Sequence, residues 1–246
     1  MTGRSPPRPL RALVTDIDGT ITDSARHLSL PAVRLLRGLE ARGIPVVLAT
    51  GNVLPIALAI HRSLGLSGPV VAENGGLLYQ RKAGVDHVER LADRRIAWRA
   101  YRRLRDEGVL VRRLFTDRWR ETEVALEPDF PVSLLRSHLK GAKVRVEGTG
   151  YAVHLMQFGA GKREALAPAL ASLGIDISDC LVAGDGDNDV DMLKAAGLGV
   201  SFSSGSPAAR RAAGLVARLP FGDGFVEALM HRDVVHRWIP RPGRLT

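Results

Sequence analysis

Leu13-Val14-Thr15-Asp16-Ile17-Asp18-Gly19-Thr20 is the stretch that decides the fold, an apolar approach that ends in two carboxylates, a glycine and a threonine. Residues such as Val14 favour a strand, and Gly19 permits a sharp exit at its carboxyl end. Residues two apart on a strand share a face, so Asp16 and Asp18 can point into one crevice, where two anions repel each other and attract a divalent cation. Alone, the stretch also fits a plain strand followed by an Asp-Gly turn, so its meaning depends on the rest of the chain.

Strands and helices alternate through the first third of the chain. Residues 31–42 have the apolar spacing of a helix that Gly43 ends, and residues 44–49 are typical of a strand buried on both faces. A second amphipathic segment, 53–64, leads to a strand at 69–72. Each strand ends in a polar turn that contains glycine. Alternation of this kind predicts a doubly wound parallel sheet whose turns line one edge.

The pattern changes at about residue 81 to a denser, more charged mixture of short candidate strands and helices. The regular alternation returns with a helix that begins at Lys162 and a strand at 179–183. The sequence therefore predicts an α/β fold with a Rossmann-like doubly wound parallel sheet. Residues 1–80 and 158–246 are expected to form this core, and residues 81–157 an inserted small α+β cap domain.

The chain has 35 basic and 26 acidic residues, a formal net charge of +9. A basic balance raises nucleic acid or an acidic ligand as a partner. The basic residues are spread along the chain, and we see no basic run with interleaved aromatic residues that would stack on bases. We therefore expect no nucleic-acid partner.

Cys180 is the only cysteine, which excludes an intrachain disulfide framework and fits a reducing compartment. No stretch approaches the roughly 20 apolar residues that span a bilayer, and residues 1–9 lack the apolar core of a signal peptide. We therefore expect a cytoplasmic protein with no membrane partner, as a monomer or homodimer.

Chemically useful side chains stand where predicted strands end and where a helix begins: Asp16 with Asp18, Thr50 with Gly51, Lys162, and Asp185 with Asp189. The run from Asp185 to Asp189 fails as a calcium-binding EF-hand loop, because Val190 replaces the required glycine. The glycines before Lys162 fail as a nucleotide-binding P-loop, because Arg163 stands where that loop needs Ser or Thr.

In order and type of spacing, these groups resemble the four motifs of the haloacid dehalogenase superfamily of aspartate-nucleophile phosphatases, over residues 10–235. The resemblance implies a phosphomonoester hydrolase. Asp16 is then expected to attack phosphorus and form an aspartyl-phosphate. Asp18 is expected to protonate the leaving oxygen and then to deprotonate the hydrolytic water.

The remaining motif residues have expected roles around the same phosphoryl group. Thr50, Gly51 and Lys162 are expected to bind its oxygens as charge shifts onto them. The resemblance also implies Mg²⁺ as cofactor, held by Asp16, Asp185 and the backbone carbonyl of Asp18, with Asp189 as a further metal-site residue that orients the ligands.

The position of the insert, between the second and third motifs, resembles the branch that contains sugar phosphatases and archaeal phosphoglycolate phosphatases. The stretches 50–52, 73–76, 150–154 and 184–192 resemble the latter, although Gly186-Asp187 departs from a commoner Ser-Glu pair. The expected partner is a small phosphorylated metabolite, first 2-phosphoglycolate. A sugar phosphate, such as sucrose phosphate or mannosyl-phosphoglycerate, is the alternative. A basic nucleic-acid-binding protein and a receiver-like binding module are the alternatives outside enzymes, although such a module lacks a second aspartate two residues after the first.

Overall fold

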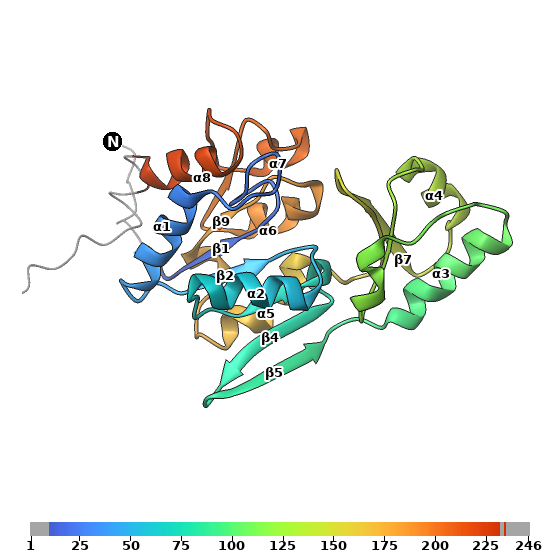
Figure 1. The fold of residues 1–246 in the computed structure, drawn as a ribbon, viewed down its shortest axis with the longest axis horizontal. Coiled ribbons are helices and arrows are strands. Elements are labelled where there is room, and N and C mark those ends of the chain that lie inside the picture. The colour runs from blue at the N-terminus through green and yellow to red at the C-terminus, as the bar shows by residue number, and fades with distance from the viewer. Residues whose placement is uncertain (1–9, 232–233, 235–246) are drawn as a thin grey trace, which may run out of the picture.

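The computed structural model describes residues 10–231 and 234, so the expectations for residues 1–9, 232–233 and 235–246 lie outside the described part. The larger sheet has the strand order β11-β10-β9-β1-β2-β3-β4-β5 (Figure 1). Its parallel part contains β1 (Ala12–Thr15), β2 (Val46–Ala49), β3 (Val70–Ala72), β9 (Cys180–Ala183), β10 (Leu198–Ser201) and β11 (Leu215–Val216).

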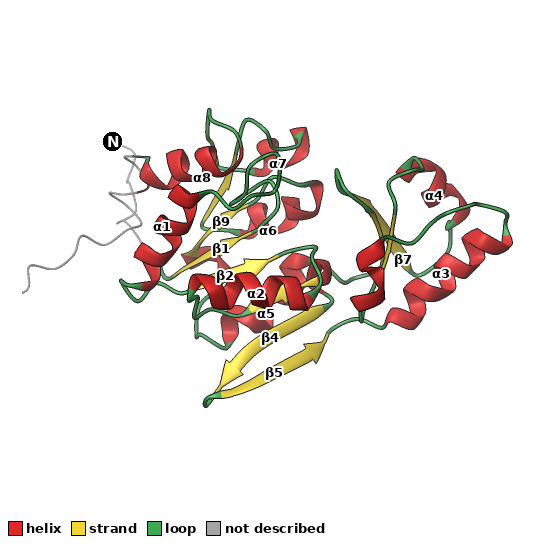
Figure 2. Cartoon of the chain, viewed as in Figure 1, coloured by secondary structure: helices red, strands yellow, loops and turns green. Residues whose placement is uncertain are grey.

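Helices cover both faces of this sheet (Figure 2). One face packs against α1 (Leu30–Glu40), α2 (Leu54–Leu64) and α8 (Phe221–Met230), and the other against α5 (Lys162–Ala171), α6 (Val190–Ala195) and α7 (Pro207–Ala212). Side chains alternate along each strand, so Leu13 enters the first apolar cluster and Val14 the second. Burial on both faces explains the continuous apolar runs of these strands. The predicted doubly wound α/β fold is confirmed.

The start of the insert predicted at residue 81 falls inside a hairpin of the large sheet. Strand β4 (Leu77–Lys82) pairs antiparallel with β3 and then with β5 (Val85–Arg90). Every residue of β5 is exposed. Charged side chains are usual on an edge strand, where they discourage pairing with other chains. Such a strand has the composition of a surface segment, so the sequence did not distinguish it from the insert.

A second sheet, with strand order β6-β8-β7, lies in the insert. The insert contains α3 (Arg94–Asp106), a 3₁₀ helix η2 (Phe115–Trp119), β6 (Val124–Leu126), α4 (Val132–His138), β7 (Val144–Gly148) and β8 (Val153–Gln157). It has an apolar cluster of its own, which includes Leu104 and Leu155. We propose residues 92–157 as the cap domain, and we use the word cap for these residues below.

Within residues 112–127 of the insert, the strand β6 covers only Val124–Leu126. The buried carboxylate of Asp117 accepts a hydrogen bond from the amide of Ala125 at 2.8 Å and ion pairs from Arg94 and Arg113. These bonds fold residues 115–119 into η2 instead of an extended strand, because a buried carboxylate needs several donors around it. Strands β7 and β8 pair antiparallel between Val144 and Gln157.

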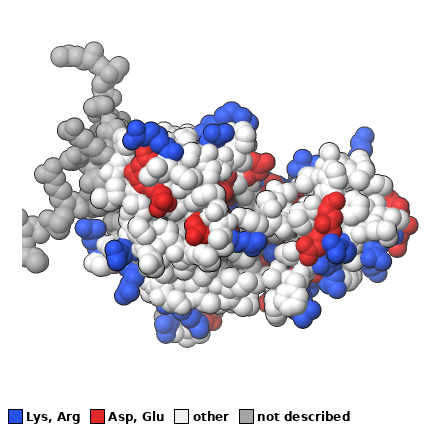
Figure 3. Space-filling view, turned by 45° about the horizontal axis from the view of Figure 1, so that its top comes forward, with Lys and Arg blue, Asp and Glu red and all other residues white. Residues whose placement is uncertain are grey.

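The surface shows no broad region of one charge on the face drawn in Figure 3, where lysine and arginine side chains form small groups separated by acidic or uncharged ones. Among the described residues, no helix is both long enough and apolar enough to cross a membrane.

Gly75 brings two distant segments together beside the carboxyl ends of the strands. After β3 the chain enters a short 3₁₀ turn η1 (Glu73–Gly75), in which Gly75 has a φ of +100°. A Cβ atom on Gly75 would lie 2.1 Å from the carbonyl oxygen of Gly161. Only glycine therefore allows this turn to pack against the start of α5.

We predict that Gly75→Ala destabilises the protein far more than Gly84→Ala. Both glycines have positive φ, so each substitution costs about 1–2 kcal/mol in backbone conformation. A Cβ on Gly84 meets nothing within 4 Å, whereas one on Gly75 collides with backbone. Urea unfolding of both variants measures the difference in free energy. Equal losses would show that the turn and α5 are not in contact.

Candidate active site

The candidate site lies at the carboxyl ends of β1, β2 and β9. The chain leaves β1 in the middle of the sheet, with β2 on one side and β9 on the other, and open α/β sheets bind ligands at such a point. A cavity of about 650 Å³ lies there between the core and the cap. Its wall includes the predicted residues Asp16, Asp18, Thr50, Gly51 and Asp185.

Asp16 and Lys162 form a buried ion pair beneath this cavity. Lys162 is the first residue of α5. Its ammonium donates to Asp16 Oδ1 at 2.8 Å and to Asp189 Oδ1 at 2.6 Å. Only 2% of Lys162 is exposed. Burial lowers the pKa of Lys162, but the charges of Asp16 and Asp189 outweigh burial and raise it. Lys162 is therefore a fixed cation behind Asp16.

Asp18 follows Asp16 by two residues and lines the same cavity. Its Oδ2 accepts a hydrogen bond from the side-chain amide of Asn52. Burial raises the pKa of the Asp18 carboxyl, against the lowering effect of Arg26 and of that bond. A raised pKa helps this carboxyl to hold a proton, as a general acid must.

The turn after β2 presents donors to the cavity. The Thr50 hydroxyl accepts a bond from the amide of Asn52, and its own proton remains available. The Gly51 amide donates to no acceptor among the described residues. The amides of Glu73 and Asn74 hold this turn in place, each through a 3.0 Å bond to a carbonyl of Asn52 or Thr50. The turn therefore offers two donors to a phosphoryl group.

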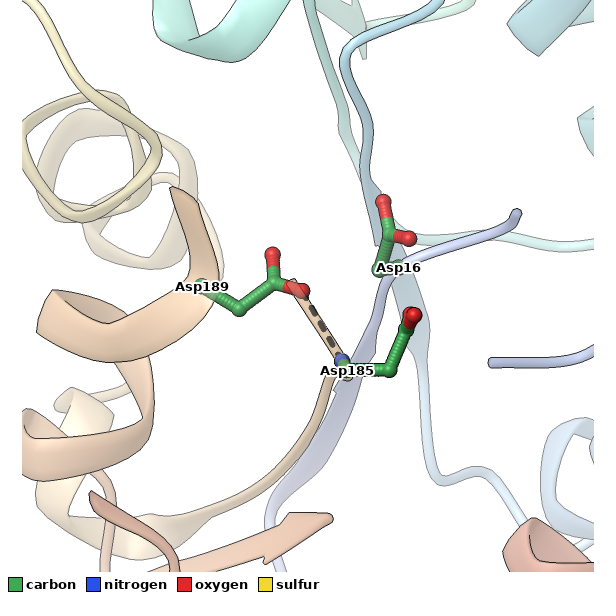
Figure 4. A group of neighbouring side chains, drawn as sticks. All are labelled: Asp16, Asp185 and Asp189. Atoms are coloured by element: carbon green, nitrogen blue, oxygen red, sulfur yellow. Dashed lines mark hydrogen bonds between the residues drawn. The ribbon is translucent and has the colours of Figure 1, made fainter. Parts of the chain in front are cut away.

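Three carboxylates meet at the candidate metal centre: Asp16, Asp185 and Asp189 offer oxygens that lie within 4.8 Å of one another (Figure 4). Asp189 already uses both oxygens, Oδ1 for Lys162 and Oδ2 for the amides of Asp185 and Gly186 at 3.0 and 2.8 Å. Asp16 Oδ2 and Asp185 Oδ2 accept no hydrogen bond from the described residues. Asp185 Oδ2 is therefore free to hold a cation, and the Asp16 carboxylate keeps one oxygen without a donor.

The electrostatics of the cluster fit a divalent cation. Burial and the neighbouring Asp189 raise the pKa of Asp185 to about 7, although Thr20 donates to its Oδ1 at 2.8 Å. Burial also raises the pKa of Asp16 well above its usual range, against the lowering effect of Lys162. Carboxylate and carbonyl oxygens are the ligands of hard cations, and the Asp18 carbonyl accepts no backbone bond here. Lys162 offsets only part of the negative charge of these carboxylates, so the residues present fit a divalent cation.

A glycine, Gly19, also allows the chain after β1 to lie against the Asp185 side chain. Gly19 has a φ of +81°, and a Cβ there would lie 2.4 Å from Asp185 Oδ2. The exit from β1 therefore needs glycine, as the sequence indicated.

The sequence analysis missed a group of polar residues that joins the cap to the core. The Glu123 carboxylate of the cap accepts hydrogen bonds from the side-chain amide of Asn74 at 3.1 Å and from His154 Nδ1 at 2.9 Å. It also forms a buried ion pair with Arg120. Asn188 in turn donates to Asn74 at 2.9 Å. A signal was available, because Asn52, Asn74 and Asn188 are the only asparagines of the chain and each stands in a glycine-rich turn.

Glu73 makes a second connection between cap and core. Its buried carboxylate accepts from the amides of Glu121 and Thr122 and from the Thr122 hydroxyl, at 2.6 to 3.1 Å. Its own φ of +50° is uncommon for a residue with a side chain. The cap therefore sits directly on the turns that follow β2 and β3.

Comparison with known proteins places the chain in a family. A model of haloacid dehalogenase-like hydrolases matches residues 13–112 and 129–229. A protein of Methanothermobacter thermautotrophicus named phosphoglycolate phosphatase is 40% identical over 220 residues, which are 89% of this chain and 97% of the relative. One from Methanopyrus kandleri with the same name is 39% identical and covers 86% of this chain and 92% of its own.

Solved structures agree with this relationship. A crystal structure of a Thermoplasma acidophilum protein matches with a TM-score of 0.81 and 25% identity, over 92% of this chain and 99% of that one. A haloacid dehalogenase-like hydrolase from Bacteroides thetaiotaomicron matches with a TM-score of 0.71 at 22% identity, over 89% of this chain and 98% of that one, which shows a common fold. The chain therefore belongs to the haloacid dehalogenase-like hydrolase family, as a phosphatase related to the archaeal phosphoglycolate phosphatases.

Proposed function

We propose that this phosphatase hydrolyses 2-phosphoglycolate to glycolate and phosphate, with Mg²⁺ as cofactor and an aspartyl-phosphate on Asp16 as intermediate. The observation that carries the proposal is the state of the Asp16 carboxylate. One of its oxygens is held by the buried ammonium of Lys162, and the other lacks a donor among the described residues and belongs to a residue of the cavity wall. A carboxylate held in this way is oriented as a nucleophile.

Two chemical steps follow from the arrangement. Asp16 Oδ2 attacks phosphorus, and the bond from phosphorus to the ester oxygen breaks while the Asp18 carboxyl gives its proton to that oxygen. Water then attacks the aspartyl-phosphate, and the Asp18 carboxylate takes up a proton from it, which releases phosphate and restores Asp16. The Thr50 hydroxyl and the Gly51 amide bind the phosphoryl oxygens during both steps.

The proposed cation site consists of Asp16, Asp185 and the carbonyl oxygen of Asp18. A Mg²⁺ ion bound there supplies positive charge that offsets the repulsion between an anionic nucleophile and an anionic ester. Asp189 holds Lys162 and the backbone of Asp185 in place. In this proposal Asp189 therefore acts on the metal site through its neighbours.

The choice of substrate is supported by the names of the relatives at 39 and 40% identity. A sugar phosphate is the second candidate, because a cavity of about 650 Å³ exceeds the needs of a two-carbon acid. The cytoplasmic location and the monomeric or dimeric state expected from the sequence remain predictions of this proposal.

We predict that 2-phosphoglycolate has a higher specificity constant than any sugar phosphate in a panel of phosphorylated metabolites assayed with Mg²⁺. Asp16→Asn is the matched control. It is expected to fold, as circular dichroism can verify, and to lose turnover, because an amide is a poor nucleophile. A variant that kept a tenth of the wild-type rate would contradict the covalent mechanism, and a sugar phosphate ranked first would contradict the choice of substrate.

We predict that substitutions of Asp185 and Asp189 have different effects on the melting temperature of the metal-free protein. Asp185→Asn removes a repelling charge, so the metal-free protein is expected to melt at the same or a higher temperature while the stabilisation by Mg²⁺ disappears. Asp189→Asn removes a partner of buried Lys162, so the metal-free protein is expected to melt at a lower temperature. Thermal melting with and without Mg²⁺, together with activity against Mg²⁺ concentration, checks both. Identical behaviour of the two variants would refute the separate roles.

We predict that the gain in melting temperature on adding Mg²⁺ is larger at about pH 8 than at about pH 5. The pKa of Asp185 rises from its ordinary value of 3.8 to about 7 on folding. Its contribution to stability is therefore greatest below about pH 4 and is lost as the pH rises through 7, unless a cation offsets the charge. Asp185→Asn is expected to flatten the difference between the two pH values. Equal gains in the wild type at both pH values would argue against a cation at Asp185.

A further inference from the structure

Arg120 of the cap is the one described arginine that is both nearly fully buried and part of the cavity wall, with 4% of its surface exposed. Its Nη1 donates to the carbonyl oxygen of Gly51 at 2.9 Å and to the carboxylate of Glu123. Glu123 is fixed in turn by His154 and Asn74. Although burial raises the pKa of Glu123, His154 and Arg120 outweigh it and hold that pKa at about 2, so Glu123 stays anionic. The guanidinium therefore has a defined position beside the phosphate-binding turn.

Two nitrogens of this guanidinium are left without acceptors. Nε is buried and has no hydrogen-bond partner, and Nη2 makes no hydrogen bond to the described residues. Burying a donor without an acceptor is unfavourable, so such a donor on a residue of the cavity wall points to a ligand that supplies the acceptor. Nε and Nη2 form the edge of the guanidinium that binds a carboxylate through two parallel hydrogen bonds.

The contact with Gly51 places the Arg120 guanidinium beside the turn that is proposed to bind phosphate. In 2-phosphoglycolate a single carbon separates the ester oxygen from the carboxylate, so a group that binds the carboxylate must stand next to the group that binds the phosphate. Arg120 is bonded to the residue whose amide is proposed to bind a phosphoryl oxygen.

Arg26 is the other arginine in the cavity wall, and its situation differs. It is exposed, and its guanidinium lies 3.9 Å from the ring centroid of Tyr151, a cap residue with 39% of its surface exposed. An exposed cation stacked on an aromatic ring selects weakly between ligands, because water competes for its donors.

We propose that Arg120 determines the substrate specificity of this phosphatase. Its Nε and Nη2 donate to a carboxylate on the leaving group, so that the site selects phosphate esters of 2-hydroxy acids over esters of neutral alcohols. This inference rests on the proposed phosphatase chemistry at Asp16. It assigns the residue that binds the acid and the class of acid, which the motifs leave open.

The test compares specificity constants for 2-phosphoglycolate and ethyl phosphate, which has a methyl group in place of the carboxylate. The wild type is expected to prefer the acid. Arg120→Gln is expected to lower the constant for 2-phosphoglycolate by about 100-fold, because the hydrogen bonds between two charged groups are lost. The constant for ethyl phosphate is expected to change little. Arg120→Lys is expected to fall between, because an ammonium cannot form the two parallel bonds. Arg105→Gln, an exposed change on α3, is the control and should leave both constants unchanged.

Other outcomes overturn the inference. Equal losses for both substrates in Arg120→Gln would show that Arg120 only supports the Gly51 turn. Loss of selectivity in Arg26→Gln, with selectivity kept in Arg120→Gln, would move the role to the exposed arginine. Because Arg120→Gln leaves Glu123 with fewer donors, the double variant Arg120→Gln with Glu123→Gln is measured as well, and melting temperatures verify folding.

The wild type alone separates this inference from the proposed function. Equal constants for 2-phosphoglycolate and ethyl phosphate in the wild type would refute selection of a carboxylate while leaving the phosphatase chemistry intact. No hydrolysis of either ester by the wild type would instead refute the proposed function.

Discussion

A single buried ammonium, that of Lys162, makes the rest of the site possible. It lies between Asp16 and Asp189, at 2.8 and 2.6 Å, with almost no contact with water. Like charges packed this closely repel strongly where water is excluded, and removing one partner of a buried ion pair typically costs about 3–5 kcal/mol. Lys162 reaches this position because Gly75 lets the turn after β3 pack against the start of α5. Asp16, the proposed nucleophile, is thus held by a residue 146 positions away in the chain.

The position of the Lys162 ammonium also makes the surroundings of Asp185 and Asp189 different. Both carboxylate oxygens of Asp189 accept hydrogen bonds, one from Lys162 and the other from backbone amides, so Asp189 stabilises the loop that carries Asp185. Asp185 keeps one oxygen without a donor, and burial raises its pKa to about 7. The metal-free site therefore favours a bound proton at Asp185, and a divalent cation can replace that proton. In the proposed function, stability and metal binding are therefore coupled through this one carboxyl.

The cap is joined to the core through the turns that surround the phosphate-binding region. Glu73 adopts an uncommon backbone conformation, whose cost is offset by four hydrogen bonds to cap residues 121 and 122. Arg120 bonds to the Gly51 carbonyl from the cap side. In the proposed function, Arg120 and the turn that binds phosphate therefore support each other through this bond. A substitution in the cap can alter chemistry in the core for this reason, and a comparison of two substrates separates selection from support.

Local patterns in the sequence determined the α/β fold and the order of its motifs, because burial on two faces produces continuous apolar strands and because parallel strands end at one edge. The meeting of Asp16, Thr50 and Asp185 in one cavity follows from that rule. Only the tertiary structure decided that β5 is an edge strand of the large sheet, that Asp189 serves Lys162, and that Arg120 and Glu123 approach the site. Arg120 is 69 positions from Gly51, and Glu123 is 49 from Asn74. Contacts at such separation leave no periodic pattern in the sequence, because they depend on how the cap packs on the core and on which donors remain free once it has packed.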